Sequence, residues 1–281
     1  MNIMNIKRLF SRIPLYIVIT VSLVVTLYPL FWIFMTSIKP FEEQVALPPY
    51  ALPRSPTFAN YINLIDSMIP VYFGNSLIVA AGTIPLIVIF GALLSFPLSK
   101  MDFKGRRVIF IVIMTGLMLP FMTSLLPLFS VYTALGLRNT YWALIIPQVG
   151  FAIPVSMYLC MGFMEQMPNS IIESGYIDGA SSFKIFRKII LPLMKNTIAT
   201  IAIFQFVFVW NEFLFARTFI SRAHMKTVPL GLNDFVDQYG LRDWGMTFAA
   251  VATTVLPTLI VFFVLNKHVM AGMTAGAVKG E

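Results

Sequence analysis

The stretch 173–192, ESGYIDGASSFKIFRKIILP, is a polar and basic interruption in an otherwise very apolar sequence. Its second half places apolar side chains at helical spacings opposite basic ones. This pattern predicts an amphipathic helix with its basic face toward water or lipid headgroups. The apolar positions are Ile185, Phe186, Ile189 and Ile190, and the basic positions are Lys184, Arg187 and Lys188.

Residues before this helix predict a second, shorter helix and a corner between the two. Ser170 and Glu173 have the spacing of a capping box, in which the serine hydroxyl and the glutamate each satisfy a free backbone N–H. Gly179 can take the left-handed conformation that ends a helix, and Ser181 or Ser182 can cap the next one. We therefore expect two short helices joined by a glycine corner.

The composition indicates a membrane protein. Of the 281 residues, 58% are hydrophobic and only 11% are charged, and the mean hydropathy is +0.83, whereas a soluble domain has about 25% charged residues. The net charge of +8 would suggest nucleic acid as the partner of a soluble protein. In a membrane protein it reflects Lys and Arg in cytoplasmic loops, so we expect no nucleic-acid partner. Cys160 is the only cysteine and has no metal-site spacing.

Charge-free runs long enough to cross a bilayer predict an all-α polytopic protein with six transmembrane helices in one domain, 1–281. Alternating strands of about ten residues are absent from the sequence, so the spans are expected to be helices. The first run is too long for a signal peptide. The predicted spans are 14–37, 73–98, 108–134, 141–164, 193–216 and 245–266.

The distribution of Lys and Arg predicts the orientation. Thirteen of the 20 lie on the side of the N-terminus, which places both termini, the 100–107 loop and the 165–195 loop in the cytoplasm. The outward segments are then 38–72, 135–140 and 217–244. The first of them is rich in proline, and we expect it to be extended.

Taken alone, the cytoplasmic region 165–192 is either an inert interfacial helix pair or a docking element. Its residues resemble the E-A-A, then G, then I-x-L-P pattern of permease subunits of ABC importers. The matching positions are Glu173, Gly179, Ile189, Leu191 and Pro192. The family usually has two alanines where this chain has Ser174 and Gly175. The glycine would weaken the helix by about 1 kcal/mol relative to alanine.

Other stretches are similar to the carbohydrate-importer branch of this family, that of maltose-type permeases, and the resemblance covers nearly the whole chain. They are Phe-Gly-Asn-Ser-Leu at 73–77, Phe-Lys-Gly-Arg at 103–106, Leu-Gly-Leu-Arg-Asn-Thr at 135–140, Trp-Asn-Glu-Phe-Leu at 210–214, Thr-Val-Pro-Leu-Gly-Leu at 227–232 and the tail 272–280.

This resemblance implies a multi-pass subunit of a sugar importer in a bacterial inner membrane. Such a subunit pairs with a second homologous permease above two ATP-binding subunits, and an extracytoplasmic solute-binding protein delivers the carbohydrate. A coupling helix between the fourth and fifth spans enters a cleft of one ATPase, and transport proceeds by alternating access. The implied coupling residues are Glu173, Ser174, Gly175, Asp178, Gly179, Ala180, Ile189, Leu191 and Pro192.

The chain is not expected to be an enzyme. No G-x-x-x-x-G-K-[ST] phosphate loop occurs in the sequence, and no nucleophile–base or metal-ligand motif appears. ATP and Mg²⁺ are therefore expected on the partner ATPase subunits, with no cofactor or metal on this chain.

Polar residues within the predicted spans are candidates for the substrate pathway, because such groups usually face a bundle interior. Gln205 and Glu212 are seven residues apart and share one helical face. The same amides could instead join helices, and Glu212 could be solvated near the outer end of its span. The candidates are Asn75, Ser76, Gln148, Gln205, Asn211 and Glu212.

Other functions stay open at this point. The cargo could be a polyol or a glycerol-phosphate ester instead of a sugar. An ion-coupled secondary transporter would need a charged group near mid-membrane, and the only acid within a predicted span is Glu212, close to one end. A membrane-embedded enzyme is disfavoured by the missing catalytic motif.

Overall fold

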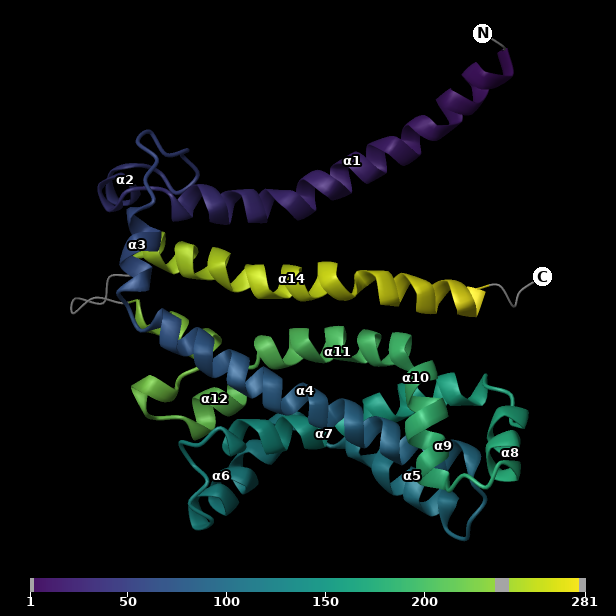
Figure 1. Ribbon diagram of the computed structural model, residues 1–281. Helices are drawn as coiled ribbons and strands as arrows, with labels where there is room; N and C mark the ends of the chain where they lie inside the picture. Colours follow the sequence, from purple (N-terminus) through teal and green to yellow (C-terminus); the bar gives the residue numbers. More distant parts are fainter. Residues whose placement is uncertain (1–2, 236–242, 278–281) are drawn as a thin grey trace. The chain divides into compact units, whose positions relative to one another are not determined.

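The computed structural model describes residues 3–235 and 243–277, with side chains from residue 13 to residue 266, and its regular elements are helices (Figure 1). Four described helices are long and apolar enough to cross a membrane. They coincide with the first, second, fourth and sixth predicted spans. Their bounds are α1 Ile3–Ser37, α4 Ile69–Lys100, α7 Trp142–Glu165 and α14 Trp244–Ala277.

The third predicted span is broken, which corrects the expectation of one continuous helix over 108–134. Its two arms, Arg106–Met118 and Phe121–Ala134, are bent by 92°. The break follows from Pro120, because a proline disfavours the helical conformation of the residue before it, and Leu119 is extended with a ψ of 118°. The arms comprise α5 Arg106–Thr115, η1 Gly116–Met118, η2 Phe121–Ser124 and α6 Leu125–Ala134.

The fifth predicted span is also shorter than expected. Helix α11, Lys195–Trp210, is bent by 73° from the arm Ser182–Leu193 that precedes it. It ends at Trp210 because the Glu212 carboxylate accepts N–H groups that begin a new helix, α12 Leu214–Phe219. Counting each bent pair as one span gives up to six spans among the described residues. Short helices follow α12: η4 Ala223–Met225, α13 Val228–Gly231 and η5 Leu232–Asp234.

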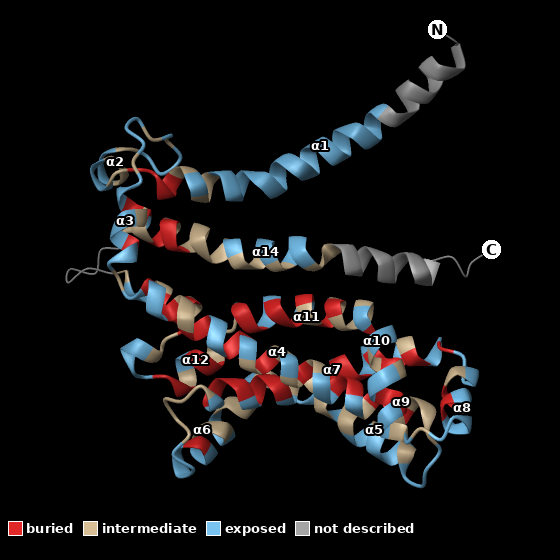
Figure 2. Cartoon of the chain, viewed as in Figure 1, coloured by how far each residue is buried: buried red, intermediate tan, exposed pale blue. Residues whose placement is uncertain are grey.

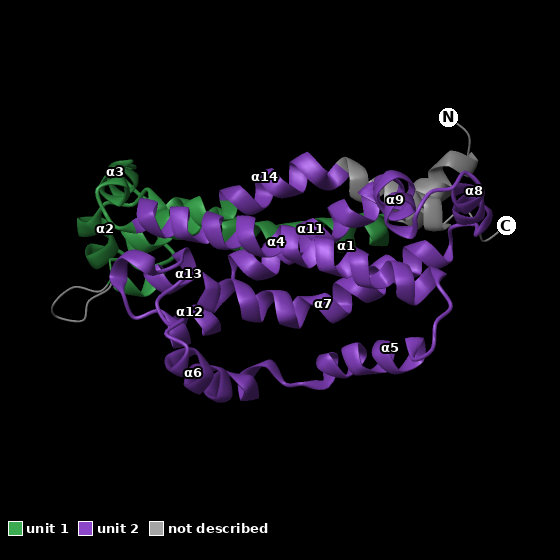
Figure 3. Cartoon of the chain, turned by 60° about the horizontal axis from the view of Figure 1, so that its bottom comes forward, with its two compact units in different colours: residues 1–68, 232–255 green, residues 69–231, 256–281 purple. Residues whose placement is uncertain are grey.

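The contacts divide the predicted single domain into two compact units, coloured separately in Figure 3, and each is described by itself. One unit contains 1–68 and 232–255, and the other contains 69–231 and 256–281. Two predicted segments lie partly outside the described residues: the outward loop 217–244 and the C-terminal tail 272–280.

In the first unit, two short helices interrupt the proline-rich segment that was expected to be extended: α2 Phe41–Ala46 and α3 Ala59–Ile65. The buried Asn60 amide fastens α3 to the end of α1 by donating to the carbonyls of Ser37 at 2.8 Å and Lys39 at 3.0 Å. The backbone N–H of Arg54 is the main group that lowers the pKa of Glu43 on α2. The proline-rich segment is therefore folded and is held by its own hydrogen bonds.

The second unit is built around α4, α7 and α11, whose facing sides are buried (Figure 2). Gly91 on α4 allows a close approach to α7, since a Cβ at this position would lie 3.0 Å from the Cβ of Ser156. Small residues permit such contacts between membrane helices. Along α1, in contrast, apolar side chains from Ile13 to Phe34 are largely exposed, as expected for a surface that faces lipid.

Candidate functional site

The coupling region, residues 165–192, lies at one end of the second unit, and α6 and α12 lie at the other end (Figure 1). Its first helix is α8, Ser170–Ile177. The predicted capping box is wrong, because α8 has no side-chain cap. Asn169 already has helical dihedral angles (φ −65°, ψ −26°), so Ser170 lies inside the first turn instead of at the cap. The backbone carbonyl of Asn169 accepts the N–H of Glu173 at 3.0 Å.

The corner after α8 follows the prediction. Gly179 has a φ of +72°, which glycine adopts without steric cost. The N–H of Ala180 donates to the carbonyl of Gly175 at 3.0 Å, and that of Gly179 donates to Tyr176 at 3.0 Å. These two bonds form a Schellman motif, which satisfies the last carbonyls of α8 and reverses the chain.

Gly175 marks the place where the second arm crosses α8. A Cβ there would lie 3.0 Å from Cγ1 of Ile185 and 3.3 Å from Cδ1 of Ile189. The glycine at the family's alanine position therefore lets the two arms pack closely. This packing offsets its weaker helix propensity.

The second arm has the predicted amphipathic character. Ser181 accepts the N–H of Lys184 at 3.4 Å and caps α9, Ser182–Ile185. Ile185, Phe186 and Ile190 are buried, whereas Lys184, Arg187 and Lys188 are exposed.

A π-helical turn, η3 Phe186–Ile190, follows α9 and leads into α10, Leu191–Leu193. This turn was not predicted from the sequence. Its signal is Pro192, which has no N–H to donate to the carbonyl of Lys188 four residues earlier. The widened turn therefore lies directly before the proline, and π turns often occur at functional sites.

The tip of the coupling region exposes both charge and apolar surface. Glu173 is exposed, and its carboxylate has no hydrogen bond or ion pair with any residue the structure describes. Ile177 is 85% exposed and Phe183 is 64% exposed. Exposed apolar groups rimmed by polar residues are typical of a protein–protein interface.

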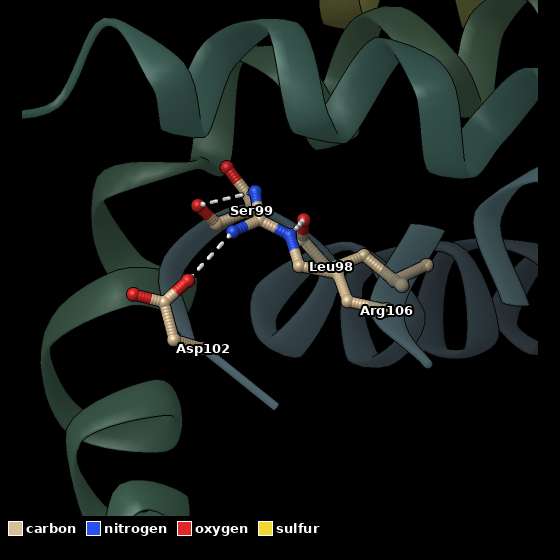
Figure 4. A network of polar contacts seen from close by, with 4 residues as sticks. All are labelled: Leu98, Ser99, Asp102 and Arg106. Atoms are coloured by element: carbon tan, nitrogen blue, oxygen red, sulfur yellow. Dashed lines mark hydrogen bonds and ion pairs between the residues drawn. The ribbon is translucent and has the colours of Figure 1, made fainter. Parts of the chain in front are cut away.

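The end of α4 beside this region is held by Arg106, as Figure 4 shows. Its Nε donates to the carbonyl of Leu98 at 2.7 Å and its Nη2 to that of Ser99 at 3.4 Å. Nη1 pairs with Asp102 at 3.3 Å. A cation at a helix C-terminus binds the free carbonyls and complements the helix dipole. Arg106 therefore closes the 100–107 loop onto α4.

A second candidate site is a cavity of about 480 Å³ within the second unit. Three of the predicted pathway residues line it: Gln148, Gln205 and Glu212. Its aromatic side chains come from four elements, and the break in the third predicted span contributes one of them, Phe121. The aromatic residues are Phe121, Phe151, Phe208 and Phe215. Amides and a carboxylate among aromatic rings suit a hydroxyl-rich ligand.

The polar groups of this cavity also have bonds within the chain. The Gln148 amide donates to the carbonyl of Leu144 at 3.0 Å, and the Gln205 amide donates to the hydroxyl of Ser156 at 3.5 Å. Glu212 accepts the N–H of Phe215 at 2.6 Å and that of Ala216 at 3.1 Å. Glu212 is therefore held by α12 and is not simply solvated.

The other three pathway candidates are not among the residues that line this cavity. Asn75 and Ser76 are buried on α4 and fasten the segment 224–228: the Asn75 amide donates to the carbonyls of His224 at 2.9 Å and Lys226 at 2.8 Å. Ser76 accepts the N–H of Val228. Asn211 is exposed and bonds to Val207 on the preceding helix. Contact of these three with substrate stays a prediction.

Three aromatic residues of the cavity were not predicted from the sequence: Phe121, Phe151 and Phe215. These residues belong to η2, α7 and α12, so their proximity depends on the fold. Phe121 and Phe215 have ring centroids 4.5 Å apart although 94 positions separate them. The one available signal is Pro120, which predicts a bend beside Phe121.

The comparison with known proteins identifies the family. Residues 87–274 match the model of the binding-protein-dependent transport system inner membrane component. The chain belongs to this family. It is thus a permease of the ABC transporter type and a multi-pass membrane protein, as the resemblance in the sequence implied.

Other permeases align with this chain over nearly its full length. The inner membrane ABC transporter permease protein YcjP of Escherichia coli (strain K12) is 34% identical over 98% of this chain and 99% of its own. The trehalose/maltose transport system permease protein MalG of Thermococcus litoralis is 31% identical over the same shares. A solved chain of a bacterial ABC transporter that imports alginate, an acidic polysaccharide, has a TM-score of 0.79. It is 21% identical and covers 93% of this chain and 97% of its own, which confirms the all-α membrane fold.

We predict that Asn75→Ala destabilises this permease by about 1–3 kcal/mol, because the change removes the hydrogen bonds that a buried amide makes to the segment 224–226. The Asn75 side chain also accepts the Tyr141 hydroxyl at 2.7 Å. The buried thiol of Cys160, the single cysteine, reports unfolding through its labelling by a thiol-reactive fluorophore on heating in detergent. Asn211→Ala is the matched control and should label as the unaltered protein does. Equal midpoints for the two variants would contradict the role of Asn75 in the fold.

Proposed function

We propose that this chain is one of two permease subunits of an ATP-driven importer of carbohydrates in a bacterial inner membrane. The coupling region is the observation that supports this most directly. Its exposed Glu173, its glycine corner and its exposed apolar tip form a compact projection suited to a cleft in another protein. Relatives such as the trehalose/maltose permease support a sugar as the cargo.

In this proposal α8 enters an ATP-binding subunit. Glu173 forms a charge-assisted contact with a basic residue of that subunit, and Ile177 fills an apolar pocket beside it. Losing one partner of a buried charge pair costs a few kcal/mol, so Glu173 would contribute strongly to docking. ATP and Mg²⁺ bind to the ATPase subunits, whose closure moves the coupling region and reorients the helices.

The complex we propose contains this chain, a second homologous permease, two ATP-binding subunits and an extracytoplasmic binding protein. Both termini, the 100–107 loop and the coupling region face the cytoplasm, in agreement with the excess of Lys and Arg there. The segment 217–235 then faces the binding protein. Its hydrogen bonds to Asn75 and Asn139 give that protein a fixed surface to approach.

The cavity lined by Gln148, Gln205 and Glu212 is this chain's proposed share of the translocation pathway. Its amides and carboxylate can hydrogen-bond to sugar hydroxyls, and its phenylalanine rings can pack against the apolar faces of a pyranose. A pathway must bind its cargo weakly enough to release it, and a few hydrogen bonds among apolar contacts meet this requirement.

We expect Gly179→Leu to uncouple transport while leaving the complex assembled. A leucine at a positive φ costs about 1–2 kcal/mol and distorts the corner that presents α8. The measurement is substrate-stimulated ATPase activity and uptake in proteoliposomes. Gly136→Leu is the matched control, since Gly136 also has a positive φ of 67° but lies in the loop after α6, at the other end of the second unit. Full substrate stimulation and uptake in Gly179→Leu would count against the docking role.

We expect Gln205→Leu to lower sugar uptake roughly three- to tenfold, which corresponds to the loss of one hydrogen bond. Basal ATPase activity should be unchanged, because Gln205 lies in α11, outside the coupling region, and lines the cavity. The control is Asn63→Leu, which removes an exposed amide that neither lines the cavity nor belongs to the predicted pathway residues. If both variants reduced uptake equally, the cavity would not be the site of contact.

A further inference from the structure

One lysine side chain makes hydrogen bonds that fasten the start of the coupling region to α4. Lys100, the last residue of α4, donates from Nζ to the backbone carbonyl of Met167 at 2.7 Å and to Oδ1 of Asn169 at 2.8 Å. Met167 follows the C-terminus of α7, and Asn169 immediately precedes α8. One ammonium group therefore joins α4, the end of α7 and the beginning of α8.

The charge of Lys100 suits this position. The carbonyls at the end of α7 carry the negative end of its helix dipole, and a lysine there is stabilising. Arg106 already binds the carbonyls at the end of α4 itself, so Lys100 is not required for that helix (Figure 4). The hydrogen bonds of Lys100 hold the segment 167–169, which leads into α8.

A second contact from α4 reaches the other arm of the coupling region. The rings of Phe96 on α4 and Phe186 in the π-helical turn have centroids 5.6 Å apart, and both side chains are buried. One turn of α4 thus separates the residue that holds the entry to α8 from the residue that packs on the exit. A displacement of the coupling region would be transmitted to α4 through both of its arms.

We infer that Lys100 is a positioning residue for energy coupling. It fixes the start of α8 to α4, so that movement of the docked ATPase is transmitted to α4, which packs extensively on α7. This inference rests on the proposed function. In the proposed complex, Lys100 contacts neither ATP nor cargo. The side chain acts through Met167 and Asn169.

The test replaces Lys100 by Met, which keeps the chain length and removes the ammonium group. We expect uptake per ATP hydrolysed to fall roughly three- to tenfold in proteoliposomes, the loss of about one charge-assisted hydrogen bond at a partly exposed site. Basal ATPase activity and subunit composition should be retained. Lys100→Arg restores the charge and should recover most of the coupling. The control Lys104→Met removes an exposed lysine from the same loop.

The outcomes separate this inference from the proposed function. If the unaltered complex shows no ATP-dependent uptake, the proposed function fails. If it does, and Lys100→Met has the uptake per ATP of the unaltered complex, only the inference is overturned. A fall of the same size in Lys104→Met would also overturn it, because a general effect of loop charge would then be sufficient. If Lys100→Met lowers assembly but leaves uptake per ATP unchanged, Lys100 has a structural role only, and the inference is again wrong.

Discussion

The close crossing of two short helices at Gly175 is the contact on which the coupling region depends. Ile185 can approach α8 only because residue 175 has no side chain, and the chain can return to make that contact only because Gly179 has a positive φ. The crossing buries Ile185 and leaves Glu173 and Ile177 exposed on the other side of α8. Two glycines four positions apart, Gly175 and Gly179, thus convert an amphipathic sequence into a projection with a defined face.

The same region connects to the membrane helices through helix ends as well as through apolar packing, such as that of Phe186 against Phe96. Lys100 and Arg106 bind carbonyls at the C-termini of α7 and α4, where the backbone has free acceptors. Such charge-assisted bonds are directional, so they orient a small element that apolar packing alone would leave free to shift. At the opposite end of the second unit, Asn75 and Asn139 hold the segment after α12 in a similar way. Polar side chains therefore fix both ends of an apolar helical core.

Much of the fold could be predicted from the sequence, because lipid requires long apolar helices and four of them form where the apolar runs lie. The amphipathic arm, the Gly179 corner and the serine cap of α9 depend on local spacing and were also predictable. The breaks at Pro120 and Trp210, the π-helical turn and the lost capping box were not. In each case a neighbouring group determined the local backbone conformation. These groups are the ring of Pro120, the Glu212 carboxylate, Pro192 and the helical Asn169. The cavity shows the same limit, since Gln148, Gln205 and Glu212 were found as polar residues in apolar runs, whereas Phe121 and Phe215 meet only after the third span bends.

The most direct test of the account is the subunit composition of the complex. The chain would be tagged, purified gently in detergent from its native host after mild crosslinking, and its companions identified by mass. We predict an ATP-binding subunit and a second permease, with crosslinks from the coupling region to the ATPase. The sequence of the second permease would then narrow the range of possible cargoes. A lone chain or a homodimer without any ATPase would contradict the account and reduce the coupling region to a surface helix pair.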